Sequence, residues 1–166
     1  MYIKTERLEL KPIALESLDA LVELLTDDVV KQTYMVPDFS NREESEKLAQ
    51  RLITLSEQEG RYVAGIYYRD SLIGILNETE SVDDRIEVGY AILPRYHTQG
   101  FCTEALRGTI GYFFAQGINE VLAGAFAENT ASIRVMIKSG MKKLDRRDEI
   151  EYRGRVHRCV YFSIKR

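Results

Sequence analysis

In this 166-residue sequence, segments with the two-residue hydrophobic period of a strand alternate with segments that have the 3.6-residue period of a helix. This alternation restricts the fold more than any other feature. Leucines and charged residues alternate over Leu8–Pro12, which is typical of a half-buried strand. Leucines then recur with helical spacing over 15–25, and a second helical pattern begins at Ser40 or Asn41 as N-cap and ends near Gly60. The remaining patterns predict strands over 62–68, 72–80, 85–92 and 120–127, helices over 103–116 and 129–139, and two final strands joined by a turn near 152–155.

This order of elements predicts a mixed α/β sheet with helices on its faces. Only three prolines interrupt the chain, and no linker or repeat divides it, so we expect a single domain over 1–166. A domain of this size buries roughly 70% of the surface that its unfolded chain exposes, so neither a metal nor a disulfide is needed to stabilise it.

Charge and cysteine usage exclude several classes of protein. The formal net charge of −3 argues against a nucleic-acid binder. Cys102 and Cys159 form no CxxC pair, and His97 and His157 are isolated, so we expect reduced cysteines and no metal site. The first residues lack the pattern of a signal peptide, and no apolar run reaches the ~20 residues of a membrane helix. We therefore expect a cytoplasmic protein without membrane contact.

The segment Ile92–Glu104 carries the clearest functional pattern, because it joins a strand, a loop and the start of a helix. Free backbone amides and the helix dipole make such a junction suitable for a phosphate. Gly100 would let the phosphate approach the backbone, and Thr103 is the expected N-cap. The alternative is an ordinary loop that leads into a capped helix. Neither the Walker pattern nor the GxGxxG pattern of dinucleotide sites is present.

Four segments in the same order resemble the GNAT superfamily of N-acetyltransferases, in the branch of ribosomal-protein N-terminal (alanine/serine) acetyltransferases. The opening TERLELKP, Thr5–Pro12, resembles the first strand of that branch, and EVGYAIL, Glu87–Leu93, resembles a central strand. Pro94–Ala105 resembles the acetyl-CoA loop, and Asn129–Met141 resembles the helix that follows the next strand. The resemblance implies a mixed, mostly antiparallel sheet of about seven strands with four helices, and acetyl-CoA as co-substrate without a metal.

The resemblance also implies where acetyl-CoA binds. Its pyrophosphate would lie on backbone amides from Thr98 to Thr103, and its pantetheine arm would run between the strands that end at Leu93 and Ala127. Asn129 would fix that arm or the strand beside it. The implied binding residues are Ile92, Leu93, His97, Thr98, Gln99, Gly100, Phe101, Cys102, Thr103, Asn129 and Arg134.

Three positions depart from the superfamily pattern. His97 stands where Gln or Arg is usual at the loop entrance, and Cys102 stands where Gly or Ala is usual. Met136 occupies the position of the tyrosine that protonates the departing thiolate in many members. The ribosomal branch instead has a serine three residues after the asparagine, which here is Ser132.

We hypothesise that an amine attacks the acetyl group directly, with both substrates bound. Glu87 is the candidate general base, a backbone amide near Ile92 or Leu93 the oxyanion donor, and Ser132 the group that stabilises or protonates the thiolate. Two structural alternatives stay open, namely that Glu87 only pairs with a base such as Arg85 and that Ser132 only bonds its own helix backbone.

Several other residues also have two interpretations. Tyr90 fits a core or pocket wall better than an acid. Arg134 and Lys138 lie one helical turn apart and could meet the 3′-phosphate of CoA or form a solvated basic face. A third group, Tyr152, Arg153 and Arg155, could border the acceptor site or merely decorate a turn.

The acceptor is the least constrained part of the function. A protein N-terminal α-amino group is the favoured acceptor, and a small amine such as a polyamine, amino acid or aminoglycoside is the alternative. A non-catalytic acyl-CoA-binding module is a third possibility, because Met136 replaces the usual tyrosine. An open channel would suit a peptide and a closed pocket a small amine, and the loops Val36–Asn41 and Ile150–Arg155 are expected to decide between them. Similar proteins are often dimers, so a homodimer is also considered.

Overall fold

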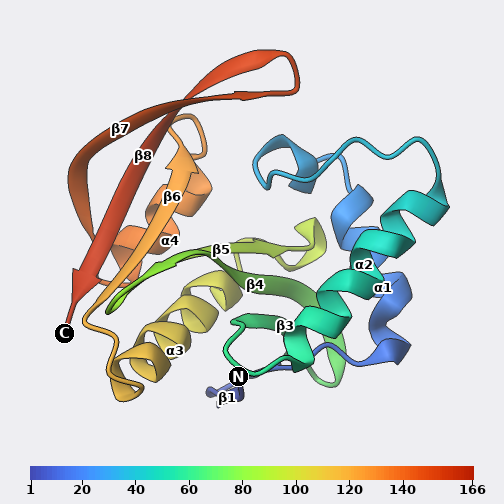
Figure 1. The fold of residues 1–166 in the computed structure, drawn as a ribbon, viewed down its shortest axis with the longest axis horizontal. Coiled ribbons are helices and arrows are strands. Elements are labelled where there is room, and N and C mark those ends of the chain that lie inside the picture. Colours follow the sequence, from blue (N-terminus) through green and yellow to red (C-terminus); the bar gives the residue numbers. More distant parts are fainter.

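A computed structural model describes residues 1–166 and contains one eight-stranded sheet with helices on both faces (Figure 1). The strand order is β1-β2-β3-β4-β5-β6-β8-β7, and every neighbouring pair is antiparallel except β5 and β6. The strands are β1 Ile3–Lys4, β2 Leu8–Lys11, β3 Val63–Tyr68, β4 Ser71–Val82, β5 Arg85–Ile92, β6 Glu120–Phe126, β7 Lys142–Tyr152 and β8 Arg155–Lys165. The predicted mixed, mostly antiparallel fold is therefore confirmed, with eight strands instead of seven because the short β1 pairs with β2.

Four α-helices cover the two faces of the sheet, as expected. They are α1 Leu18–Thr26, α2 Arg42–Glu57, α3 Phe101–Ala115 and α4 Thr130–Lys138, and short 3-10 turns lie at η1 Leu15–Ser17, η2 Val30–Gln32 and η3 Pro94–Tyr96. Asn41 caps α2, because its side chain accepts a hydrogen bond from the amide of Glu44.

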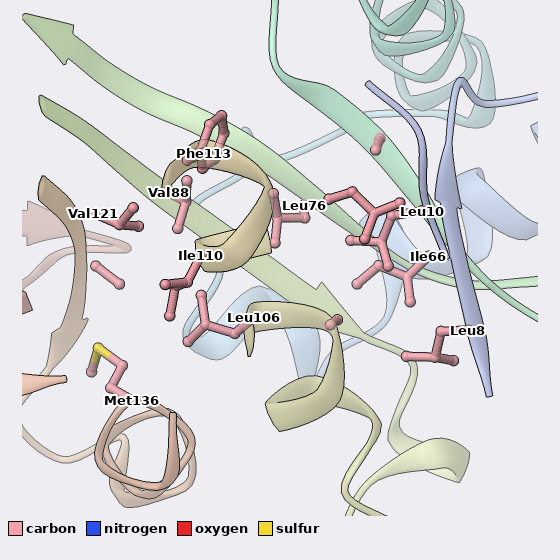
Figure 2. Close-up of a cluster of buried hydrophobic side chains, with 14 of the residues drawn as sticks. Leu8, Leu10, Ile66, Leu76, Val88, Leu106, Ile110, Phe113, Val121 and Met136 are labelled. Carbon is pink, nitrogen blue, oxygen red and sulfur yellow. The ribbon is translucent and has the colours of Figure 1, made fainter. Parts of the chain in front are cut away.

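Two hydrophobic cores lie on opposite faces of the sheet. The first packs α3 and α4 against the strands, and Figure 2 shows Leu106, Ile110 and Phe113 of α3 facing this layer. The second packs α1 and α2 against the other face. Neighbouring residues Ile66 and Tyr67 of β3 belong to different cores, as the two-residue period of a strand requires.

The parallel strands β5 and β6 separate along their length, and this separation opens a gap in the sheet. β5 and β6 pair only at Arg85–Glu120, Ile86–Val121 and Glu87–Leu122. Beyond Glu87 the two strands diverge, while β4 still pairs with β5 and β8 with β6. The facing edges of β5 and β6 therefore keep backbone groups without a strand partner, as expected for the strands that end near Leu93 and Ala127.

Candidate functional site

A cavity of about 750 Å³ occupies the gap between the diverging strands. Its volume falls within the range of roughly 300–1,000 Å³ that is common for ligand pockets. The wall comes from the η2 region, β4, β5, the loop before α3, β6, α4, β7 and β8. Of the residues proposed from the sequence, the cavity is lined by Glu87, Ile92, His97, Thr98, Gly100, Phe101, Cys102, Thr103, Asn129, Ser132 and Arg134.

Two proposed residues have side chains that lie elsewhere. Leu93 is buried in the core under α1 and α2. Gln99 is exposed, and its side chain donates a hydrogen bond to the carbonyl of Arg95 at 3.1 Å. Any contact of these two residues with a ligand in this cavity would therefore have to come from the backbone.

The loop before α3 presents a run of free amides to the cavity. Helix α3 begins at Phe101 and not at Thr103, so the prediction that Thr103 is the N-cap is wrong. Gly100 takes that position with a left-handed φ of +82°, a conformation that a residue with a side chain adopts only under strain. The amides of residues 98–103 find no acceptor within the chain, while the amide of Glu104 bonds the carbonyl of Gly100. The loop can therefore hold an anion through its backbone.

A group of hydrogen bonds between the β1–β2 turn and α3, which we call the clasp, holds this loop in place. The carboxylate of Glu104 accepts hydrogen bonds from the Thr5 hydroxyl at 2.6 Å, the Arg7 amide at 2.7 Å and the Arg7 Nε at 2.6 Å. Arg7 in turn donates from Nη1 to the carbonyl of Gln99 at 3.1 Å. These bonds link the opening TERL segment to the loop that carries the free amides.

His97 closes the end of strand β5. Its Nε2 donates a hydrogen bond to the carbonyl of Ile92 at 2.7 Å. The histidine that replaces the usual Gln or Arg at this position therefore has a structural hydrogen-bond partner.

Arg134 and Lys138 of α4 are exposed at the wall of the same cavity, where they can contribute positive charge toward an anion.

The two amides proposed as oxyanion donors differ in availability. The amide of Leu93 donates to the carbonyl of Ile73 at 2.9 Å, so it is already used inside the sheet. Amides along an antiparallel strand point alternately toward the partner strand and away from it. The amide of Ile92, opposite Gly74, therefore points away from β4 and toward the gap.

Glu87 is the last residue of β5 that pairs with β6, so its side chain stands where the two strands separate. Its side chain is only 16% exposed. Burial raises the pKa of this carboxyl above its usual range, and the nearby cation Arg146 only partly opposes the shift. Glu87 does pair with a base, as the structural alternative supposed, but that base is Arg146; Arg85 instead approaches Glu120.

Asn129 and Ser132 form a local pair at the start of α4. The Asn129 side chain accepts from the Ser132 amide at 3.1 Å, and its Nδ2 donates to the Ser132 hydroxyl at 3.2 Å. The Ser132 hydroxyl thus bonds a side chain and not the backbone of its own helix. Met136 is fully buried in the core. Tyr90 is a cavity wall, and its hydroxyl donates to the carbonyl of Ser132 at 3.3 Å.

Cys102 and Cys159 are free thiols at the cavity wall. Burial raises the pKa of Cys102 to about 12 and also raises the pKa of Cys159. Because the thiolate is the reactive form, neither thiol is suited to act as a nucleophile at neutral pH.

The hairpin tip between β7 and β8 bridges to the loop between α1 and α2. The Tyr152 hydroxyl donates to the carbonyl of Lys31 at 2.8 Å and accepts from the amide of Val36 at 3.4 Å. Arg153 forms an ion pair with Asp38. These contacts join the two loops that were expected to decide the acceptor, but none of Tyr152, Arg153 and Arg155 lines the cavity.

Many other residues of the cavity wall were not predicted from the sequence. They include Tyr34, Met35, Asn77, Thr79, Gly124, Phe126, Ile150, Cys159 and Tyr161. They come from five separate segments, so no local sequence motif predicts them. Of the two loops that were expected to decide the acceptor, Val36–Asn41 and Ile150–Arg155, only Ile150 lines the cavity.

No helix is both long and apolar enough to cross a membrane, and no three His, Cys, Asp or Glu side chains form a metal-binding group. The absence of a metal from the chemistry stays a prediction.

Comparisons with known proteins agree with this geometry. Residues 7–142 match the family described as the acetyltransferase (GNAT) domain. The uncharacterized N-acetyltransferase YoaA of Bacillus subtilis is 28% identical over 146 residues, which cover 85% of this chain and 82% of that protein. An acetyltransferase of the GNAT family from Bacillus anthracis has 23% identity and a TM-score of 0.85, with 99% and 98% of the two chains covered.

The resemblance to ribosomal-protein acetyltransferases is also confirmed as a structural likeness. RimL, a ribosomal alpha-N-protein acetyltransferase solved in complex with coenzyme A, has 20% identity and a TM-score of 0.86, with 99% and 98% of the chains covered. The chain therefore belongs to the GNAT acetyltransferase family, and its enzyme class is that of the acetyl-CoA-dependent N-acetyltransferases.

Proposed function

We propose that the cavity binds acetyl-CoA and a primary amine together and transfers the acetyl group directly between them. One observation carries this proposal: the free amides of residues 98–103 and the half-buried Glu87 lie on the same cavity, along the gap between β5 and β6. The amides suit the pyrophosphate, and the unpaired strand edges suit the amide groups of the pantetheine arm. A carboxylate at the point where β5 and β6 separate, which we call the fork, suits an approaching ammonium group.

The chemistry requires one proton acceptor, one oxyanion donor and one group near the sulfur. Glu87 takes one proton from the ammonium, directly or through one water, and the neutral nitrogen attacks the acetyl carbonyl carbon. The extra proton that the nitrogen then carries passes to water or, by way of the Ser132 hydroxyl, to the departing sulfur. The amide of Ile92 donates to the oxygen that becomes negative. When the C–S bond breaks, the Ser132 hydroxyl stabilises or protonates the thiolate, and the new C–N bond remains in the amide product.

The favoured acceptor is a protein N-terminal α-amino group, as in the RimL enzyme that this chain resembles. A specific observation also favours a second acceptor, a small amine. The contacts of Tyr152 with Lys31 and Val36, and of Arg153 with Asp38, bridge the acceptor side of the cavity, which restricts the approach of a folded protein surface. The cytoplasmic setting and a homodimer stay predictions.

The first test is thermal unfolding with acetyl-CoA, with ATP and phosphate as controls. A ligand at 100 times its dissociation constant stabilises the native state by about 2.7 kcal/mol, which raises the midpoint by roughly 5–10 °C for a chain of this length. We expect this shift with acetyl-CoA and a much smaller one with the controls. No shift at millimolar acetyl-CoA would refute the proposed site.

The second test is release of CoA with two acceptors, a peptide that begins with serine and the polyamine spermidine. Turnover with the peptide supports the favoured acceptor, and turnover with spermidine alone supports the small amine. Binding of acetyl-CoA without turnover across a broad amine panel would instead identify a non-catalytic acyl-CoA-binding module.

A further inference from the structure

Arg146 lies in an irregular part of strand β7. The pairing of β7 with β8 shifts register between Lys143 and Arg147, so the residues between them have no regular partner on β8. Irregularities of this kind turn a side chain away from its usual direction and are common beside active sites. Here the side chain of Arg146 reaches across the sheet to Glu87 of β5.

The contacts of Arg146 fix its guanidinium at three points. Nη1 lies 3.3 Å from a Glu87 carboxylate oxygen, and Nη2 lies 3.0 Å from an Asp148 carboxylate oxygen. The guanidinium carbon is 3.9 Å from the centre of the Tyr161 ring. Asp148 and Tyr161 thus hold a cation whose free edge is directed at Glu87.

Two strands, β6 and β8, lie between Glu87 and Arg146, and a glycine on β6 leaves room for the contact. A Cβ on Gly124 of β6 would lie 2.8 and 3.0 Å from two carbons of the Tyr161 ring and 3.6 Å from a Glu87 oxygen. Such distances to a ring require the ring to move. The absence of a side chain at Gly124 therefore lets Tyr161 and Glu87 come together.

We propose that Arg146 is a positioning residue for acetyl transfer, which orients the Glu87 carboxylate at the fork and keeps it ionised for the incoming ammonium group. This inference rests on the proposed role of Glu87 as general base. Arg146 does not line the cavity, so it acts through Glu87 and not on the substrate.

The charges around Glu87 determine how the loss of Arg146 would change the protonation of the Glu87 carboxyl. Burial and the neighbouring Glu80 of β4 both favour the protonated carboxyl, whereas Arg146 of β7 and a weak bond from the Thr79 hydroxyl favour the carboxylate. The other titratable groups beside this cluster are Asp148 of β7 and Cys159 and Tyr161 of β8. Loss of Arg146 leaves burial and Glu80 largely unopposed, so Glu87 would keep its proton to higher pH.

The decisive experiment compares R146M with R147M in pH profiles of kcat/KM, with the more active of the seryl peptide and spermidine as acceptor. Methionine keeps an apolar stem over Tyr161 but removes the cation. Arg147 is the matched control, because it is the next residue, carries the same charge and has an 82% exposed side chain. The acceptor's own titration is common to all variants.

We expect R146M to move the acidic limb of the kcat/KM pH profile to a pH about one unit higher. At a pH below that limb, this shift is about a tenfold loss of kcat/KM. R146K should restore part of the shift, and R147M should leave the limb in place. A uniform loss at every pH in R146M, or an equal shift in R147M, would overturn the proposal.

A second measurement separates the role of Arg146 from the role of Glu87. The Glu87 carboxyl is titrated by carbon NMR in the full chain and in R146M, without any acceptor. An unchanged titration would refute the effect of Arg146 on Glu87. A raised titration, together with an E87Q enzyme that keeps the wild-type profile, would preserve that effect but refute the proposed base. If both proposals hold, R146M causes no further loss in an E87Q background.

Discussion

The clasp around Glu104 can be tested by its effect on stability. The substitution Glu104→Ala removes the acceptor of three hydrogen bonds, from the Thr5 hydroxyl and from the amide and Nε of Arg7. A hydrogen bond to a charged group contributes about 1.5–3 kcal/mol. The Arg7 side chain is 39% exposed, so water replaces part of the lost interaction. We therefore expect a loss of about 3 kcal/mol, which lowers the unfolding midpoint by roughly 6–12 °C in a domain of this size.

The matched control is Glu43→Ala. Both glutamates stand in the first turn of a helix, so each substitution removes the same favourable interaction with the helix dipole, about 0.3–1 kcal/mol. The side chain of Glu43 is 74% exposed, and its ion pair is with Lys47 in the same helix. Thermal unfolding of both variants at neutral pH gives the comparison. If Glu104→Ala costs no more than Glu43→Ala, the clasp does not stabilise the fold.

The difference in the free energy of unfolding between the wild type and Glu104→Ala should also depend on pH. Burial favours the protonated form of Glu104, but the hydrogen bonds from Thr5 and Arg7 outweigh it, so the pKa lies below its ordinary value. A carboxyl with a lowered folded-state pKa stabilises the protein above its unfolded pKa of about 4.3. This contribution is lost as the pH falls through the folded-state pKa. The gap in stability between the wild type and Glu104→Ala should therefore narrow below about pH 4, as measured by unfolding in urea.

Two further substitutions test the acceptor side of the cavity. Gly124→Ala should lower kcat more than it weakens acetyl-CoA binding, because the new Cβ lies 2.8 Å from the Tyr161 ring beside Glu87; steady-state kinetics with calorimetric binding checks this, and unchanged kcat contradicts it. Tyr152→Phe removes the hydroxyl that bonds Lys31 and Val36, so the seryl peptide should gain in kcat/KM relative to spermidine. An unchanged ratio of the two acceptors would show that the bridge does not select between them.

The loop that we propose to bind acetyl-CoA could be predicted from the sequence because its structure depends on local backbone rules. The strand Arg85–Ile92 has the predicted bounds, and the loop with free amides lies where the glycine and the following helix placed it. The error at Thr103 is also local. Threonine is a good N-cap residue, but the left-handed Gly100 already turns the chain and starts the helix two residues earlier than expected.

The proposed acceptor side of the cavity could not be predicted because it depends on the order of strands in the sheet. Arg146 and Glu87 lie 59 residues apart and are brought together by the order β5-β6-β8-β7 and by the register shift in β7. Neither the strand order nor the position of a register shift follows from hydrophobic alternation, which only determines the face on which a residue lies. The pairing of Glu87 with Arg85 looked plausible for this reason, since it used residues close in sequence.

The two sides of the cavity therefore tolerate substitution differently. Backbone amides of residues 98–103 and of Ile92 do not depend on the identity of the side chains that flank them. His97 illustrates this, because the ring bonds the carbonyl of Ile92 while the amides of the loop stay free. The proposed acceptor side instead relies on side chains such as Glu87, Arg146 and Tyr152, each held by contacts from distant segments. We expect substitutions among these contacts to change the acceptor and the pH profile while acetyl-CoA binding persists, because the two sets of interactions share little beyond the fork of β5 and β6.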